Sequence, residues 1–194
     1  GRWKEYAENL FERPPGKASE TFEIPMEPEQ RLDPPTLNDV TNALKDLKSG
    51  KAPGVDGIPA ELIKHSGKTA TVALHQLICK IWQSGKWPDD WRTTEFVTIH
   101  KAGSTKECSN YRTIALISHA SKVFLIILLK KLIGKIEEEL PNEQAAYRRK
   151  RGTADMLATL RILLEKVHGL QESQTFVIFI DYSKAFDNVS HVQL

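Results

Sequence analysis

The 194-residue chain has little cysteine and no long hydrophobic run, and both shortages narrow its class. Its two cysteines, Cys79 and Cys108, lie far apart, so a disulfide framework and a cysteine-rich zinc module are excluded and a reducing compartment is expected. No apolar run approaches the ~18 residues of a membrane-spanning helix, so we expect no membrane partner. These shortages together predict an intracellular protein, with the nucleus and the cytoplasm both open.

The chain also lacks a strong excess of charge of either sign. Its 27 basic and 25 acidic residues give a net charge of +2, which excludes neither a nucleic-acid-binding protein nor an ordinary enzyme. The local distribution is more informative, because between His100 and Lys131 the only acidic residue is Glu107. The basic residues of this segment are Lys101, Lys106, Arg112, Lys122, Lys130 and Lys131. This surplus predicts a surface that faces a polyanion.

Prolines separate an amino-terminal region from the rest of the chain. Residues 2–11 place aromatic and apolar side chains at helical spacing, whereas residues 13–35 contain six prolines and cannot propagate a helix. We therefore expect residues 1–35 to form a linker region with an amino-terminal helix and residues 36–194 to form one domain. The first residue is not Met, and the chain ends soon after an apolar segment, so we expect part of a longer polyprotein.

Within residues 36–194 the periodicities predict a helix-rich α/β fold. Thr36 is the expected cap of the first helix, and Gly85 is the expected end of the third. Helices are expected over 36–47, 59–64, 69–84, 118–138 and 153–168, and strands over 95–100, 112–116 and 176–180. A basic, glycine-rich loop covers 48–57, where we assign Gly54 and Gly57 to turn geometry.

Residues 176–187, FVIFIDYSKAFD, are the most informative segment of the chain. The apolar run predicts a buried central strand, and Asp181 leaves this strand at its carboxyl edge, where α/β folds bind their ligands. A carboxylate held in this way can bind a metal ion rigidly. The competing interpretation is that Asp181 forms a turn or caps a helix, and the same capping role is expected of Asp187.

The heptapeptide at 181–187 closely resembles the first catalytic motif of reverse transcriptases, in the form found in non-LTR (LINE-type) retrotransposons. Four more segments, 51–64, 97–101, 108–116 and 142–155, resemble further motifs of that family in the same order. Residues 2–11 resemble the segment that joins the family's endonuclease and polymerase domains. The resemblance covers about Leu37 to His191, and the ordered set of motifs is far more specific than any one of them.

The resemblance implies the fingers and first palm strand of a right-hand polymerase fold, ending before the catalytic Asp-Asp hairpin and the thumb. It implies that Asp181 and the carbonyl of Tyr182 bind magnesium, with two ions in the complete enzyme. Lys101 and Arg112 would hold the incoming triphosphate, and Phe186 would exclude a ribose 2′-hydroxyl. If the resemblance is set aside, Lys101 and Arg112 are expected to be ordinary surface residues, and Phe186 is expected to pack in the core.

A cluster of adjacent cations, Arg148, Arg149, Lys150 and Arg151, follows Tyr147. Basic side chains can bind a template backbone by releasing its counterions, and Tyr147 can stack on a base. A solvated loop and a nuclear-import signal remain alternatives. The family commonly has glycine where Lys150 stands; if that residue takes a positive φ, lysine would strain the turn.

We therefore interpret the chain as a fragment of an RNA-directed DNA polymerase that uses an RNA template, a DNA primer and deoxynucleoside triphosphates. An endonuclease domain is expected upstream in the polyprotein, and the fragment alone is expected to be inactive. The rival hypothesis is a non-enzymatic RNA-binding or interaction module from a decayed retroelement. A metal-dependent phosphatase built around Asp181 is disfavoured, because it would need an acid at the position of Ser183.

Overall fold

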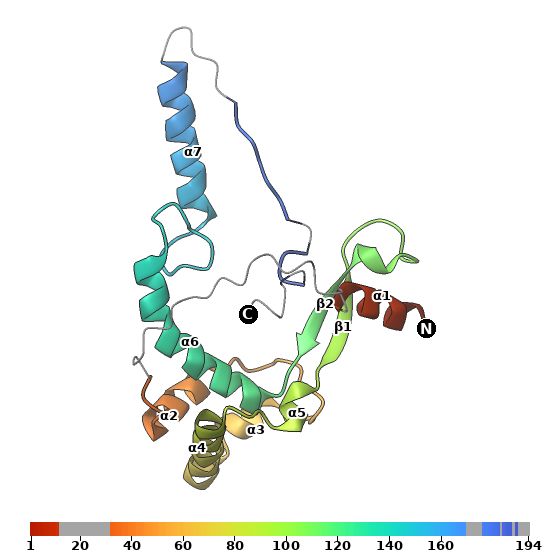
Figure 1. Cartoon of the computed structure of the whole chain (residues 1–194), viewed down its shortest axis with the longest axis vertical. Helices are drawn as coiled ribbons and strands as arrows, with labels where there is room; N and C mark the ends of the chain where they lie inside the picture. Colours follow the sequence, from red (N-terminus) through yellow and green to blue (C-terminus); the bar gives the residue numbers. More distant parts are fainter. Residues whose placement is uncertain (12–31, 170–175, 183, 188, 190–194) are drawn as a thin grey trace, which may run out of the picture. The chain divides into compact units, whose positions relative to one another are not determined.

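The computed structural model describes residues 1–11, 32–169, 176–182, 184–187 and 189 (Figure 1). Its elements are, in order, α1 (Arg2–Phe11), α2 (Leu37–Asp46), α3 (Ala60–Lys64), α4 (Gly67–Ser84), α5 (Asp89–Arg92), β1 (Glu95–His100), a 3₁₀ turn (Cys108–Asn110), β2 (Tyr111–Leu116), α6 (His119–Glu139) and α7 (Thr153–His168). The chain divides into two compact units, with the division inside α6 after Leu132. The fold is thus mixed helix and sheet, as predicted.

The first unit contains the hydrophobic core, which α2, α3, α4 and the first half of α6 build together. The largest fully buried side chains are Leu47, Ile78, Ile127, Val40 and Val123. They come from the helical faces that the 3.6-residue periodicity predicts, and each such side chain contributes about 1.5–3 kcal/mol by leaving water. This core therefore fixes the helices from which the hairpin β1–β2 extends.

Helix α2 begins at a capping box, as Thr36 was expected to cap it. The amide of Asp39 donates to the Thr36 hydroxyl at 3.1 Å, and the amide of Thr36 donates to the Asp39 carboxylate at 2.8 Å. The Thr36 amide is the main reason that the pKa of Asp39 lies below its ordinary value, and Lys131 and Lys130 lower it further. The carboxylate is therefore more stable in the folded chain than in the unfolded one.

Replacing Asp39 with asparagine is expected to lower the free energy of unfolding at neutral pH by about 0.5 kcal/mol, since solvent screens this partly exposed group. A lowered pKa stabilises the fold above the unfolded value and loses that effect as the pH falls through the folded value. The difference between the two proteins should therefore shrink from about pH 4 downward. Urea unfolding followed by circular dichroism between pH 7 and pH 3 measures it. A difference that stayed constant across this range would contradict the role of the charge.

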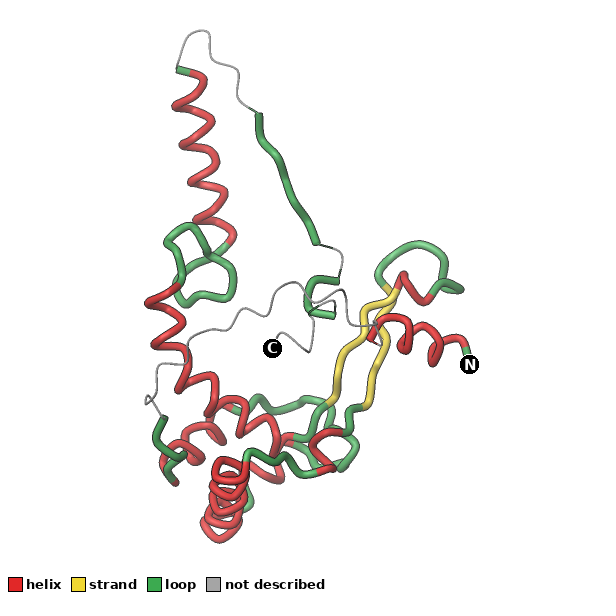
Figure 2. Tube along the Cα trace, viewed as in Figure 1, coloured by secondary structure: helices red, strands yellow, loops and turns green. Residues whose placement is uncertain are grey.

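The β-structure among the described residues is one antiparallel hairpin of β1 and β2 (Figure 2). Glu95 pairs with Leu116 at one end and His100 with Tyr111 at the other. Beyond the last pair, the Lys101 amide donates to the Asn110 carbonyl at 2.8 Å. The register thus continues past the strand and fixes the position of Lys101.

The second unit contains Leu10 and Phe11 at the end of α1, the end of α6, the loop after it, α7 and the described carboxyl-terminal residues. Helix α7 has the predicted bounds, but none of its residues is buried. Residues 176–180 correct the prediction of a buried central strand: they lie in no strand, and their exposed fractions run from 47% to 84%. A strand needs a neighbour to accept its hydrogen bonds, and β1 and β2 pair only with each other in the described residues.

Of the described helices, none is long and apolar enough to cross a membrane. The expected boundary near residue 35 stays a prediction, because it falls beside residues 12–31, which lie outside the described residues.

Candidate functional site

Lys101 and Arg112 lie on the same face of the hairpin. Arg112 pairs with Ile99, and side chains two residues apart on a strand point to the same side, so Lys101 shares the face of Ile99 and Arg112. Both cations are exposed. The hairpin therefore presents two positive charges at diagonal positions, an arrangement that can bind two oxygens of one polyanion.

Between these cations and Glu95 at the far end of β1, that face is apolar and also exposed. Val97, Ile99 and Ile114 keep 43%, 49% and 44% of their surface accessible. On the opposite face, the rings of His100 and Tyr111 make an edge contact with centroids 5.0 Å apart. The two faces of the hairpin thus differ: one carries the cations beside exposed apolar side chains, and the other carries an aromatic pair.

Two of the six basic residues in the predicted polyanion-facing segment are engaged within the first unit. Lys130 forms an ion pair with Asp46, and Lys131 lies over the Trp82 ring, 5.8 Å from its centroid. Both contacts fasten α6 to neighbouring helices. The surplus of charge that remains exposed lies mainly on the hairpin and its tip, at Lys101, Lys106 and Arg112.

The glycine-rich loop packs against the start of α6. A Cβ added to the buried Gly54 would lie 2.6 Å from the carbonyl carbon of Ile117 and 2.7 Å from the nitrogen of Ser118. Gly57 has φ +64°, as turn geometry requires, whereas Gly54 is needed for this close approach of two backbones. The prediction that Gly57 serves turn geometry is thus confirmed. The same prediction for Gly54 did not foresee that Gly54 allows two backbones to approach closely.

The same loop is tied to α3 at its other end. The Gly50 amide donates to the Glu61 carboxylate at 2.5 Å and is the first cause of the lowered pKa of Glu61. Lys64 donates to the Leu47 carbonyl at 2.9 Å. Lys48 and Lys51 remain exposed. The loop is therefore held on both sides, with its cations directed to solvent.

The basic cluster separates into two arginines that bond to the loop, of which Arg148 is largely covered and Arg151 is exposed, and residues whose side chains extend into solvent. Arg148 keeps only 10% of its side-chain surface accessible; it pairs with Glu137 at 2.8 Å and donates to the Pro141 carbonyl at 2.8 Å. Arg151 donates to the carbonyl of Asn142 at 3.3 Å. Tyr147, Arg149 and Lys150 are exposed, Tyr147 by 88%. The first group holds the loop after α6 together, and the second is available to a ligand.

Lys150 has φ +60°, the positive value at which lysine was expected to strain this turn. Tyr147, with φ +60°, shares that conformation. A left-handed backbone costs a non-glycine residue free energy because its Cβ crowds the neighbouring carbonyl. The loop therefore stores strain on both sides of Arg148.

Replacing Lys150 with glycine is expected to raise the free energy of unfolding by about 0.5–1 kcal/mol, because relieved strain outweighs the greater flexibility of the unfolded chain. Arg149→Gly removes the same charge at a neighbouring residue whose φ is not positive, and it should lower stability instead. Urea unfolding of both variants gives the comparison. Equal destabilisation by the two changes would show that the backbone of Lys150 is not strained.

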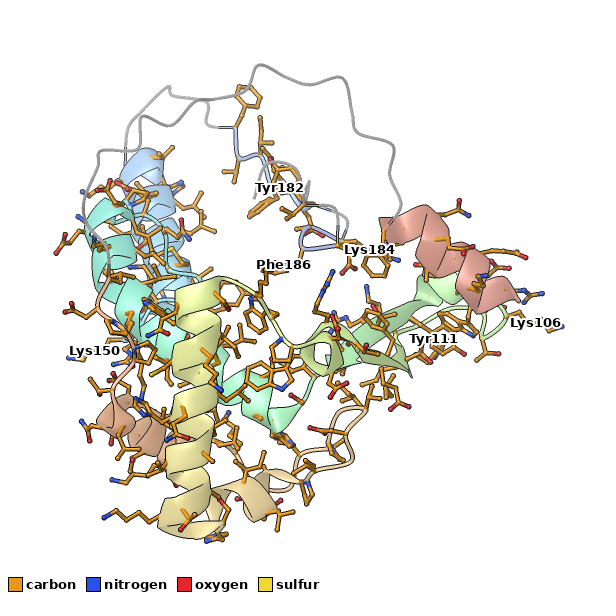
Figure 3. All side chains as sticks on the ribbon, turned by 60° about the horizontal axis from the view of Figure 1, so that its bottom comes forward. Lys106, Tyr111, Lys150, Tyr182, Lys184 and Phe186 are labelled. Carbon is orange, nitrogen blue, oxygen red and sulfur yellow. The ribbon has the colours of Figure 1, made fainter. Side chains whose placement is uncertain are left out.

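Asp181, Tyr182 and Phe186 belong to the second unit, and all three are exposed. The ring of Phe186 meets the ring of Tyr147 edge to face, with centroids 6.0 Å apart. Phe186, Tyr182 and Lys184 are labelled in Figure 3. The structure thus joins a residue of the basic loop to the residue expected to select the sugar, a contact that the sequence pattern could not reveal.

The donors near Asp181 suit magnesium in kind and fall short in number. Carboxylate and carbonyl oxygens, as at Asp181 and Tyr182, are ligands that magnesium prefers. Across the described ranges, no three side chains of His, Cys, Asp or Glu lie close enough to share one ion. Asp181 can therefore provide one part of a metal site, and further ligands must come from other residues.

The predicted residues form two sets. Lys101 and Arg112 share a face of the hairpin in the first unit, while Asp181, Tyr182, Phe186 and the cluster 147–151 lie in the second.

Comparison with known proteins shows which class of protein carries residues like these. Residues 99–194 match the family described as reverse transcriptase (RNA-dependent DNA polymerase). This stretch contains the hairpin cations, the basic cluster and the segment around Asp181. Residues 99–194, about half of the chain, are therefore similar to the reverse transcriptase family.

The relatives narrow this class to non-LTR retrotransposons. The chain is 26% identical over 179 residues to the RNA-directed DNA polymerase from mobile element jockey of Drosophila melanogaster, covering 90% of this chain and 19% of the relative. It is 26% identical to the probable RNA-directed DNA polymerase from transposon BS of the same fly, with 89% and 19% covered. A Pol polyprotein from retrotransposable element R2 of Popillia japonica is 30% identical, with 81% and 21% covered.

The chain thus spans about a fifth of the length of these curated relatives. The predicted resemblance to the amino-terminal part of a non-LTR reverse transcriptase domain is confirmed.

Proposed function

We propose that this chain forms the fingers and the first palm motif of an RNA-directed DNA polymerase. The observation that supports this most is the shared face of Lys101 and Arg112 within the matched region, because two fixed cations can stabilise the charge of a transferring triphosphate. Tyr147, Arg149 and Lys150, which are exposed, would contact an RNA template or DNA primer. Arg148 and Arg151 would shape the loop that presents them.

The remaining roles follow from the motif at 181–187. Asp181 and the Tyr182 carbonyl would bind magnesium, and two ions in the complete enzyme would activate the primer hydroxyl and stabilise the leaving phosphate. Phe186 would exclude the ribose 2′-hydroxyl, so that deoxynucleotides are preferred. An upstream endonuclease domain in the same polyprotein remains part of the proposal, as does a location in the nucleus or the cytoplasm.

Binding of dTTP with Mg²⁺ to the 194-residue chain, measured by titration calorimetry, tests the triphosphate role directly. Replacing Arg112 or Lys101 with alanine is expected to weaken binding by about tenfold or more, as the loss of a charge-assisted contact implies. Lys122→Ala is the matched control, since it removes one exposed cation of the same unit outside the hairpin. Equal weakening by all three changes would indicate general electrostatics and would contradict a specific clamp.

A further inference from the structure

The hairpin that carries Lys101 and Arg112 is not expected to be stable by itself. A two-stranded hairpin is marginally stable in water and needs a third strand or a packed helix. In the described residues the sheet has only β1 and β2, and the face with the cations leaves Val97, Ile99 and Ile114 exposed. In the described residues, an aromatic contact that supports the hairpin lies on its other face.

Helix α1 contacts the hairpin on the side away from the cations. Tyr111 pairs with His100, one residue out of phase with Arg112, so its ring points to the opposite face. The Trp3 ring meets the Tyr111 ring edge to face, with centroids 5.2 Å apart, and Tyr6 meets Trp3 at 5.9 Å. A row of four rings, from Tyr6 through Trp3 and Tyr111 to His100, thus joins the helix to the strands.

Polar contacts fix the same junction at the tip of the hairpin. The Arg2 guanidinium donates to the Lys106 carbonyl at 2.8 Å, across 104 residues of sequence. The Tyr111 hydroxyl donates to the Thr105 carbonyl at 3.0 Å. Figure 3 labels Tyr111 and Lys106 where α1 meets the hairpin. Arg2 and Trp3 therefore hold both the tip and the first residue of β2, beside Arg112.

We propose that α1 is a positioning element for the triphosphate clamp, and that Trp3 and Arg2 are its positioning residues. This inference rests on the proposed function, because it assigns α1 the task of holding β2 so that Arg112 and Lys101 keep their spacing. Undocking of α1 leaves a hairpin that is ordered only part of the time. The apparent affinity for a triphosphate then falls in proportion to the ordered fraction.

The test compares dTTP·Mg²⁺ affinity with hydrogen exchange of the hairpin amides in the 194-residue chain. Trp3→Ala is expected to weaken dTTP binding about fivefold to tenfold if the ordered fraction falls to between a fifth and a tenth. It should also speed exchange of the Lys101 amide, which is bonded to the Asn110 carbonyl. Trp3→Phe keeps an edge-to-face contact and should restore most of both effects.

A second pair of variants separates positioning from charge. Arg2→Ala and Lys4→Ala each remove one positive charge from α1, but Lys4 pairs with Glu8 on the same helix and Arg2 reaches the hairpin. Arg2→Ala should weaken dTTP binding and speed exchange, and Lys4→Ala should do neither. These variants lie outside the core of α2, α3, α4 and α6, so the rest of the first unit remains folded.

The outcomes distinguish the two proposals. If the unaltered chain binds dTTP and Arg112→Ala abolishes binding, while Trp3→Ala and Arg2→Ala leave both the affinity and the amide exchange unchanged, α1 is not a positioning element and the proposed function stands. If the unaltered chain does not bind dTTP, or binds it equally well after Arg112→Ala, the proposed function fails and this inference fails with it.

Discussion

Replacing Gly54 with alanine is expected to lower the free energy of unfolding by about 3 kcal/mol, the upper end of what overpacking costs. The new Cβ would lie 2.6 Å from the carbonyl carbon of Ile117, 2.7 Å from the nitrogen of Ser118 and 2.9 Å from the Ile117 oxygen. These are backbone atoms, so no side-chain rotation can relieve the contact. Either the loop 48–57 or the start of α6 must move.

The contact matters for function because of what Ile117 and Ser118 join. Ile117 directly follows β2, which contains Arg112, and the Ser118 hydroxyl accepts the Ser121 amide at 3.1 Å in the first turn of α6. A shift here displaces the hairpin from the helix that anchors it in the core. We therefore expect Gly54→Ala to weaken dTTP binding as well as to lower stability.

Gly134→Ala is the matched control for this substitution. Gly134 lies inside α6, and a Cβ added there meets no atom within 4 Å. Alanine should stabilise the helix by about 0.5–1 kcal/mol, because it restricts the unfolded chain and favours helical geometry. Urea unfolding of the two variants should thus give effects of opposite sign. A Gly54→Ala protein as stable as the parent would show that the loop does not pack on the α6 start.

The sequence predicted the local structure well, because helix periodicity and capping act over a few residues. The bounds of α7, the cap at Thr36, the left-handed Gly85 that ends α4 and the strand β1 all agree with what their residues dictate. Strain at Lys150 was expected from the glycine that the family commonly has at this position, on the condition that the residue takes a positive φ, and its φ of +60° meets that condition. Helix periodicity and capping depend on a few neighbouring residues, so they can be predicted without knowing the rest of the fold.

Contacts between distant residues were not predictable in this way. Nothing in the composition of residues 2–11 says that Trp3 meets Tyr111, and Arg148 looked like its exposed neighbours until the loop placed it on Glu137. The prediction of a strand over residues 176–180 was wrong for a related reason, because a strand forms only with a hydrogen-bonding partner. Charge and periodicity show which structures and ligands a segment is compatible with, and its tertiary contacts determine which structure it adopts.

Asp181 leads to the prediction with the largest effect on activity: the 194-residue chain should incorporate no nucleotide on poly(rA)/oligo(dT) with Mg²⁺. Each of two magnesium ions needs several oxygen ligands, and phosphoryl transfer requires both ions close together. In the described part of the chain, no cluster of acidic, histidine or cysteine side chains can hold an ion by itself. Asp181 and the Tyr182 carbonyl are thus expected to form only part of a site.

The assay separates missing chemistry from missing folding and from missing template contact. The RNA-directed DNA polymerase of mobile element jockey serves as the positive control for primer extension, since it is 26% identical to this chain. Binding of an RNA/DNA hybrid by the 194-residue chain should persist without incorporation, and it should weaken steeply with salt, because Arg149 and Lys150 are exposed. Nucleotide incorporation that Asp181→Ala abolishes would overturn the prediction, and it would show that the chain assembles a complete metal site around this carboxylate.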